Sequence, residues 1–309
     1  MEQSVRRAQG LMLVSTVLVA TSFPVGAAIT HGMDSVVLTL LRFTLAAFLF
    51  GPIVAWRYGL PLPSWSDLAR YGTISACLVL FFWGMFAALR LTSPLNTATI
   101  FTLTPGIAAA VSAVLLRERL PRVAQLALPV GMIGAVWVIF RGDWDALLAM
   151  DLGKGDAIFF GATIAMGCFT PLVKLLHRGE PMARMTFWTL MTGAGWLLLL
   201  SLGRLGDVEW GAVPDQVYAG IAYLAVFTTI VTFFITQGSA TIIGPTKVMS
   251  FTYLNPALVM LISLGFGAPL PPAATYPGLI LIIGATIILQ RGATGSGGSA
   301  IGPGAKPAG

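Results

Sequence analysis

The sequence predicts an all-α integral membrane protein with ten transmembrane helices, arranged as two inverted repeats of five helices. Three observations support this fold class. The composition is too apolar for a water-soluble surface, apolar segments of membrane-spanning length recur along the chain, and two prolines of the first half recur at one fixed spacing in the second half. These features argue against a soluble globular domain.

The composition indicates that the fold is surrounded by lipid. Of 309 residues, 56% are hydrophobic and only 10% are charged, whereas a soluble domain carries roughly 25% charged residues. The formal charge of +6 arises from basic residues at the ends of apolar segments. This placement indicates membrane topology and argues against nucleic-acid binding. The expected surroundings are a lipid bilayer, and no nucleic-acid partner is expected.

Apolar segments long enough to cross a bilayer give the predicted helices. A spanning helix needs about 20 mostly apolar residues to cross roughly 30 Å of hydrocarbon. The first segment also resembles a secretory signal peptide, because Arg6 and Arg7 precede it, but the repeat described below requires it as a helix. The ten predicted segments are 10–30, 34–56, 67–90, 94–116, 122–140, 154–176, 182–203, 214–239, 244–266 and 273–290.

The distribution of basic residues predicts the orientation. If the N-terminus is cytoplasmic, twelve Lys and Arg residues lie on the cytoplasmic side and four on the other. Positively charged loops stay on the cytoplasmic side of a membrane. We therefore expect a multi-pass protein of the bacterial inner membrane with both termini in the cytoplasm. Its C-terminal tail, rich in Gly, Ser, Ala and Pro, is expected to be disordered.

An internal repeat is visible in the fourth and ninth segments. Pro94 and Pro105 of the fourth correspond to Pro245 and Pro256 of the ninth, both at an offset of 151 residues. Five helices are an odd number, so the second copy enters the membrane from the opposite side, which gives an inverted repeat. The expected organisation is a first repeat over residues 1–146, a second over 147–291 and a tail over 292–309.

The same offset places an aromatic pair of the third segment opposite one of the eighth. Phe82 and Trp83 correspond to Phe233 and Phe234.

The pattern resembles the drug/metabolite transporter superfamily in its form with two tandem EamA-type units. The stretches that carry the resemblance are Ala87-Ala88-Leu89-Arg90 through Glu118-Arg119-Leu120, and Val248 through Leu264 with Tyr253-Leu254-Asn255-Pro256. The acidic residue expected at the end of the fourth helix of each unit is Glu118 in the first half and is missing in the second. The resemblance implies transport of a small molecule. Bacterial exporters of aromatic amino acids and of methyl viologen are similar in length and arrangement.

Two mid-membrane prolines are candidate kinks or gates. Pro105 and Pro256 each remove a backbone hydrogen bond, and the freed carbonyls must find partners or line a wet cavity. Two interpretations of these prolines remain open: they kink the helices for packing, or they expose backbone beside a substrate cavity. Thr104 and Asn255 stand beside these prolines and are candidate substrate contacts, as is Asn96 at the start of the fourth segment.

Two basic residues fall inside predicted helices. Arg42 is about 12 Å deep if its helix starts at Asp34, so it is either paired, snorkelling or in contact with substrate. Lys247 is near a helix end, where snorkelling, a gate or a substrate contact would explain it. Among the aromatic residues, Trp83 and Phe234 are cavity candidates, with lipid or core packing as the alternative.

Six glycines in apolar segments are expected to allow close helix packing: Gly131, Gly134, Gly193, Gly195, Gly278 and Gly284.

The sequence contains no phosphate-binding GxxxxGK[ST] motif, metal-ligand cluster or catalytic constellation. We therefore expect no enzyme activity, no metal and no cofactor. The favoured function is a secondary transporter that exports amino acids or related metabolites by alternating access through a central cavity. A channel, a lipid scramblase, or a carrier of nucleotide sugars or cationic drugs remain alternatives. The oligomeric state is open, and a monomer is compatible with the sequence.

Overall fold

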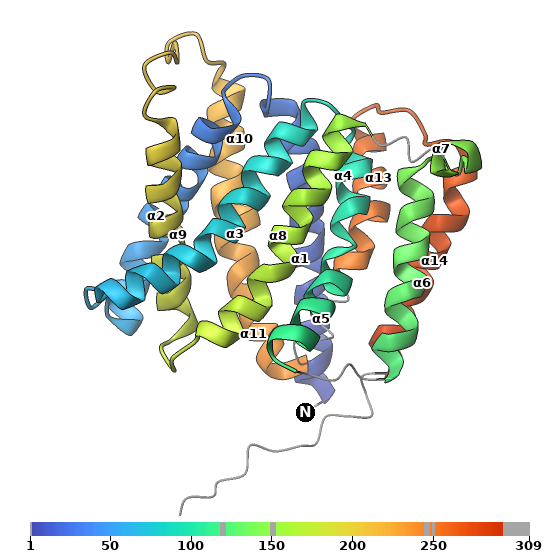
Figure 1. The fold of residues 1–309 in the computed structure, drawn as a ribbon, viewed down its shortest axis with the longest axis horizontal. Helices are drawn as coiled ribbons and strands as arrows, with labels where there is room; N and C mark the ends of the chain where they lie inside the picture. The colour runs from blue at the N-terminus through green and yellow to red at the C-terminus, as the bar shows by residue number, and fades with distance from the viewer. Residues whose placement is uncertain (1, 118–121, 149–152, 244–247, 249–250, 293–309) are drawn as a thin grey trace, which may run out of the picture.

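The computed structural model describes residues 2–117, 122–148, 153–243, 248 and 251–292, and these residues form helices and short connections without strands (Figure 1). The first half contains α1 (Glu2–Ile29), α2 (Ser35–Tyr58), α3 (Trp65–Leu89), α4 (Pro94–Phe101), α5 (Thr104–Leu115), α6 (Arg122–Ile139) and α7 (Trp144–Leu148). The second half contains α8 (Lys154–Leu176), α9 (Met182–Ser201), α10 (Asp215–Ala225), η1 (Val226–Val231), α11 (Thr232–Ile243), η2 (Phe251–Leu254), α13 (Asn255–Gly265), η3 (Ala273–Thr275) and α14 (Tyr276–Gly292).

The all-α membrane fold predicted from the sequence is confirmed. Six segments of the described chain are long and apolar enough to cross a membrane, namely Gln3–Ile29, Ser35–Tyr58, Trp65–Leu89, Pro94–Leu115, Lys154–Leu176 and Asp215–Thr236. Three shorter apolar helices are Gln125–Ile139, Phe251–Gly265 and Ala273–Ile288. Every predicted segment coincides with helix in the described residues, while the number of ten crossings stays a prediction.

The helix packing follows the two-fold relation that an inverted repeat requires. α2 packs along α9 and α6 along α14, and each of these two pairs joins a helix to its own counterpart. α4 packs against α13, which joins the fourth predicted segment to the ninth. The contact of α3 with α8 also has its equivalent, the contact of α11 with α1, because the third predicted helix corresponds to the eighth and the first to the sixth. In Figure 1 the α2–α9 pair and the α6–α14 pair lie at opposite sides, with α1, α3, α4, α8 and α13 between them.

Two helices are interrupted at equivalent places on this axis. The segment 94–116 divides into α4 and α5 after Phe101, and α5 has Pro105 near its start. α13 likewise follows η2 and has Pro256 near its start. A proline cannot donate to the carbonyl four residues earlier, and for Pro105 that carbonyl belongs to Phe101. Leu103 instead donates to the carbonyl of Ile100 at 3.0 Å, so the break tightens into a 3₁₀ turn.

One helix contains a π turn that the sequence did not predict. The segment 214–239 is α10, then the π-helical η1, then α11. A π turn usually inserts one residue into an α-helix. The offset between the repeats increases by one residue across this turn, as such an insertion requires. It is 150 between the helix starts Trp65 and Asp215 and 151 between Phe82 and Phe233. α3, the counterpart, is a continuous α-helix.

The α2–α9 pair is tied at both ends. At the upper end in Figure 1, Arg204 donates to the Oδ2 atom of Asp34 at 3.0 Å. At the lower end, Arg184 donates to the carbonyls of Tyr58 and Gly59, the latter at 3.1 Å. Each tie joins the start of one helix of the pair to a connection of the other repeat, so the ties are related by the pseudo-two-fold axis.

A buried ion-pair network joins the repeats at the lower end. Arg70 donates to Glu180 Oε1 at 2.8 Å, to the carbonyl of Leu176 at 2.6 Å and to Asp67 Oδ1 at 3.0 Å. Burial alone would raise the pKa of Glu180, but hydrogen bonds from the backbone N–H groups of Glu180 and Arg178 and the charge of Arg70 outweigh burial and lower that pKa. Glu180 is therefore held as a carboxylate.

Four of the six glycines singled out in the sequence lie at close helix contacts, as expected. They are Gly131, Gly134, Gly193 and Gly278. The expectation is wrong for Gly195 and Gly284, where a Cβ atom would have no neighbouring atom within 4 Å. Sequence spacing alone does not tell a helix face that meets another helix from one that meets lipid.

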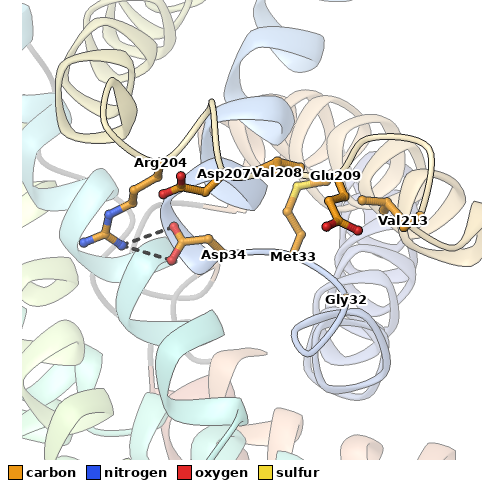
Figure 2. Close-up of a pocket in the computed structure, with 9 residues that line it drawn as sticks. Gly32, Met33, Asp34, Arg204, Asp207, Val208, Glu209 and Val213 are labelled. Atoms are coloured by element: carbon orange, nitrogen blue, oxygen red, sulfur yellow. Dashed lines mark hydrogen bonds and ion pairs between the residues drawn. The ribbon is translucent and has the colours of Figure 1, made fainter.

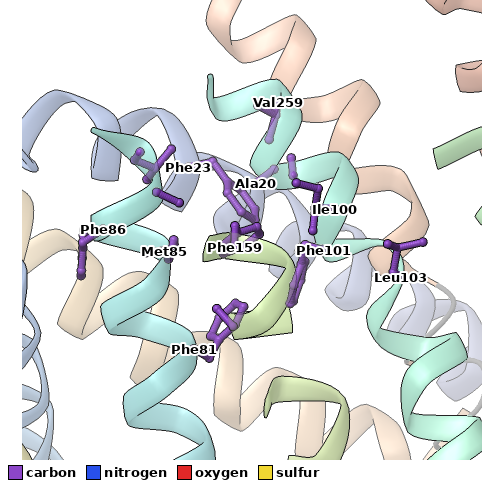
Figure 3. Packing of buried hydrophobic residues seen from close by; sticks show 14 of the residues in the cluster. Ala20, Phe23, Phe81, Met85, Phe86, Ile100, Phe101, Leu103, Phe159 and Val259 are labelled. Carbon is purple, nitrogen blue, oxygen red and sulfur yellow. The ribbon is translucent and has the colours of Figure 1, made fainter. Parts of the chain in front are cut away.

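The core between the central helices is aromatic. Phe23, Phe81, Phe101 and Phe159 come from α1, α3, α4 and α8 and converge in Figure 3. Phe23 lies 5.9 Å from Phe101 and 6.3 Å from Phe159, while Phe81 lies 5.3 Å from Phe101 and 5.7 Å from Phe159, measured between ring centroids. At 1.5 Å per helical residue, the cluster is roughly 8–12 Å below the upper ends of these helices. It fills the centre of the bundle on that side.

Candidate functional site

Arg42 is the most deeply buried cation of the described residues, ahead of Arg70. It lies on α2 and is 1% exposed. Its Nη2 atom donates to the hydroxyls of Thr228 at 3.0 Å and Thr229 at 3.1 Å, and its Nε atom donates to Thr229 at 3.3 Å. Both threonines belong to the π turn η1. The ring of Phe82 covers the guanidinium at 4.1 Å.

The partners of Arg42 are neutral. The hydroxyls of Thr228 and Thr229 both donate to the carbonyl of Leu224, at 2.9 and 3.0 Å, so their oxygens are left to accept from the guanidinium. The ion pairs between described residues do not include Arg42. Its Nη1 atom has no hydrogen-bond partner among them. Within the described part of the chain, the site therefore holds a positive charge with no compensating carboxylate and with one donor unused.

Further unsatisfied polar groups lie at the helix breaks, and two of them occupy equivalent positions in the repeats. Thr104 Oγ1 and Asn255 Oδ1 are buried and have no hydrogen-bond partner within the described chain. Thr104 is the first residue of α5 and Asn255 is the first of α13. These two residues occupy equivalent positions at an offset of 151. Buried polar atoms are nearly always paired, so each is a candidate contact for water or substrate.

Asn96 lies in a different place, at the upper end of the bundle. Its side-chain amide donates to Asp156 Oδ1 at 3.3 Å, and the hydroxyl of Thr92 donates to the same oxygen at 2.5 Å. Asp156 is 7% exposed. The three side chains line a cavity of about 680 Å³ together with Arg90 and Arg141. The sequence places Asp156 on the external side but does not reveal it as a buried carboxylate.

The aromatic candidates are not part of the Arg42 site. Trp83 is 38% exposed and shares the outer face of α3 with Leu80, which is 50% exposed. Phe234 is 39% exposed and packs on Phe50, with ring centroids 5.4 Å apart. The structure brings Phe82, the neighbour of Trp83, to Arg42. Lys247 lies outside the described residues.

A second cavity at the upper end is acidic. It has a volume of about 490 Å³ and lies between the α1–α2 and α9–α10 connections (Figure 2). Its lining includes Asp34, Asp207 and Glu209, with Arg204 paired to Asp34. This cavity is separate from Asn96 and Asp156, so the upper surface has two polar depressions.

Sequence reasoning named Arg42, Thr104 and Asn255 as candidates but missed their surroundings. Thr228 and Thr229 carry no motif, and the π turn that presents them would be seen only in the one-residue increase of the repeat offset. That increase depends on the helix starts Trp65 and Asp215, which the structure gives, so the sequence alone did not show it.

The fold and the site together define a class of protein. Two inverted repeats with interrupted helices at their interface are the architecture of secondary transporters. The sequence matches the EamA-like transporter family over residues 6–140 and 153–290, one match in each half. The chain belongs to this family, which confirms the resemblance seen in the sequence.

Comparison with individual proteins supports transport and the fold. The "Uncharacterized transporter YyaM" of Bacillus subtilis (strain 168) is 27% identical over 213 residues, which cover 69% of this chain and 67% of the relative. A solved crystal structure superposes with a TM-score of 0.65 at 18% identity, over 93% of this chain and 98% of its own. At that identity the likeness shows the fold alone. The protein is thus a multi-pass membrane transporter.

Proposed function

We propose that the protein is a secondary transporter that exports amino acids or related small metabolites by alternating access through the centre between its repeats. It resides in the bacterial inner membrane with both termini in the cytoplasm. The substrate is a small molecule, and transport requires no cofactor.

The pair of interrupted helices supports this proposal most directly. Thr104 and Asn255 are the first residues of α5 and α13, equivalent positions in the two repeats, and each carries a buried oxygen without a hydrogen-bond partner among the described residues. In inverted-repeat carriers, interrupted helices near the midplane form the substrate site. Irregular backbone at membrane depth is tolerated where it is buried in protein or lines a wet cavity.

The aromatic cluster of Phe23, Phe81, Phe101 and Phe159 fits the same mechanism. It joins α1, α3 and α4 of the first repeat to α8 of the second. Because the two repeats are near-equivalent, a relative rotation that separates these rings would open the centre toward the upper side and close it toward the lower side. Rocking of one repeat against the other is the general form of alternating access.

Counterflow in proteoliposomes tests the function. We expect saturable uptake of at least one labelled amino acid that is accelerated by the same compound inside the vesicle. Flux that is neither saturable nor accelerated by exchange would instead indicate a channel or scramblase. Thr104→Val and Asn255→Ala should each raise the half-saturating concentration by a few-fold to about tenfold, the usual worth of one hydrogen bond.

A matched control is available in the same interrupted helix. Thr99 is fully buried, and its hydroxyl is satisfied by the carbonyl of Leu95 at 2.7 Å. Thr99→Val should leave the half-saturating concentration unchanged. If Thr104→Val and Asn255→Ala also leave it unchanged, the two residues are not substrate contacts, although the transport function would stand.

A further expectation concerns coupling. The sequence places no Asp or Glu in the middle of a predicted helix, and proton-coupled carriers usually have an ionisable group there. We propose exchange down a gradient, with at most weak proton coupling. Counterflow should therefore proceed at equal internal and external pH, and a strict requirement for a pH gradient would exclude this mechanism.

A further inference from the structure

The charge of Arg42 has no counter-charge in the described structure. Among these residues it meets two hydroxyls and an aromatic ring, and its Nη1 atom has no acceptor. A cation inside a membrane protein normally has an anionic partner or faces water. Arg42 is 1% exposed, so bulk solvent does not reach its side chain in this conformation. An anion supplied from outside the chain would complete the site.

The fold does not require an arginine at this position. Arg42 and Thr189 are each the eighth residue of helices that correspond in the two repeats, α2 and α9. Thr189 is also buried, and its hydroxyl donates only within its own helix, to the carbonyl of Met185 at 2.8 Å. The second repeat therefore has no charge at the equivalent position of the equivalent helix.

The π turn opposite Arg42 is also confined to one repeat. η1 interrupts the eighth predicted helix, whereas its counterpart α3 is α-helical from Trp65 to Leu89. Single π turns inside α-helices are frequent at functional sites. Here the turn carries the two threonines that fix one side of the guanidinium. A charge and a local insertion that face each other, both absent from the other repeat, point to function and not to packing.

The geometry points to a carboxylate as the ligand, and we propose that Arg42 binds the carboxylate of the transported substrate. This inference rests on the transport function proposed above. The Nε and Nη2 atoms are held by Thr228 and Thr229, and Phe82 covers one face, which leaves Nη1 as the free donor of a fixed, planar group. Arginine binds carboxylates through short, charge-assisted hydrogen bonds. A substrate would reach Nη1 after a movement of Phe82, which connects Arg42 to Phe81 of the aromatic cluster.

The first experiment measures binding, independently of transport. Purified protein in detergent is melted with a panel of L-amino acids, with the matching amino acid amides and decarboxylated amines, and with inorganic phosphate. A ligand that binds the native state raises the melting temperature by mass action. We expect at least one amino acid to bind about 10- to 100-fold more tightly than its amide, the usual worth of a hydrogen bond to a charged group.

Variants then locate the preference. Arg42→Gln should reduce the carboxylate-to-amide preference to about one, and Arg42→Lys should retain the preference at weaker affinity because lysine keeps the charge but not the planar fork. Thr189→Val, the matched change in the other repeat, should leave the preference intact. The wild-type comparison needs no variant, so it decides the question even if Arg42→Gln does not fold.

The outcomes separate this inference from the transport function. Equal binding of acids, amides and amines by the wild type would overturn it, as would stabilisation by phosphate alone, a carboxylate preference retained in Arg42→Gln, or no binding of any probe. In each of these cases saturable counterflow would still support transport. If carboxylates bind through Arg42 but no counterflow is seen, the proposed transport function would be overturned, while Arg42 would still be a carboxylate-binding site.

Discussion

The contact between α6 and α14 depends on a reciprocal pair of glycines. A Cβ atom on Gly134 would lie 2.6 Å from the carbonyl oxygen of Gly278 and 2.8 Å from Cβ of Leu281, and one on Gly278 would lie 2.6 Å from the carbonyl oxygen of Gly134. Ordinary contacts between such atoms begin near ~3.5 Å. Because the opposing atoms are backbone, no side-chain rotation relieves the overlap. Gly134→Ala must therefore push the helices apart by roughly 1 Å.

The expected change in stability follows from two opposing effects. Overpacking of a close contact costs about 1–3 kcal/mol, and rigid backbone places this site in the upper part of that range. Alanine favours the helix by about 1 kcal/mol relative to glycine. The net loss is about 1–2 kcal/mol, which at the usual scale for domains of 150–250 residues lowers the melting temperature by roughly 2–8 °C. Tryptophan fluorescence during heating in detergent measures it.

Gly284 provides the matched control on α14. It has no atom within 4 Å of its Cβ position, so Gly284→Ala should gain the helix propensity of alanine and raise the melting temperature slightly. If Gly134→Ala melts at or above the temperature of Gly284→Ala, the close approach of the two helices does not exist and the axis drawn through this pair is incorrect.

The remaining predictions concern polar groups at the ends of the bundle. Arg204→Ala should lower the free energy of unfolding by under about 1 kcal/mol, and by less at high salt, because its ion pair is half exposed. Asp34→Ala should lower it by about 1 kcal/mol more than Asp34→Ser, since Asp34 also caps α2 and serine restores a cap. Melting curves at two salt concentrations measure both effects, and equal losses of stability for Asp34→Ala and Asp34→Ser would exclude the cap. Folding lowers the pKa of Glu180, so the carboxylate contributes to stability above the unfolded value of about 4.5, and this contribution is lost as the pH falls through the lower folded value. The melting temperature of the wild type should therefore decrease as the pH is lowered through this range, and that of Glu180→Gln should decrease less steeply. Asp156→Asn should destabilise the protein by about 1–3 kcal/mol because its carboxylate accepts hydrogen bonds from two side chains, whereas Asn96→Ala should destabilise it less. If Asp156→Asn leaves the melting temperature unchanged, the carboxylate is solvated.

The prediction of Arg42 as a site shows how far sequence reasoning extends. A charge eight residues into an apolar helix is visible in the sequence, and the membrane makes it significant. Its partners are not visible, because Thr228 and Thr229 are nearly two hundred residues away and only the tertiary fold brings them to the guanidinium, at 3.0 and 3.1 Å. The same limit applies to Trp83. The repeat indicated its position along the helix, but the sequence did not show that it lies on the outer face of α3.

The sequence by itself determined that the protein is helical, membrane-embedded and duplicated, because apolar segments of about 20 residues cross lipid as helices and because paired prolines mark equivalent positions. Only the tertiary structure decided which faces of those helices meet. Periodicity was a weak guide to this, since lipid-facing and core-facing positions are both apolar in a membrane helix. The helix breaks beside Thr104 and Asn255, the π turn opposite Arg42 and the buried carboxylate of Asp156 depend on those contacts between distant segments.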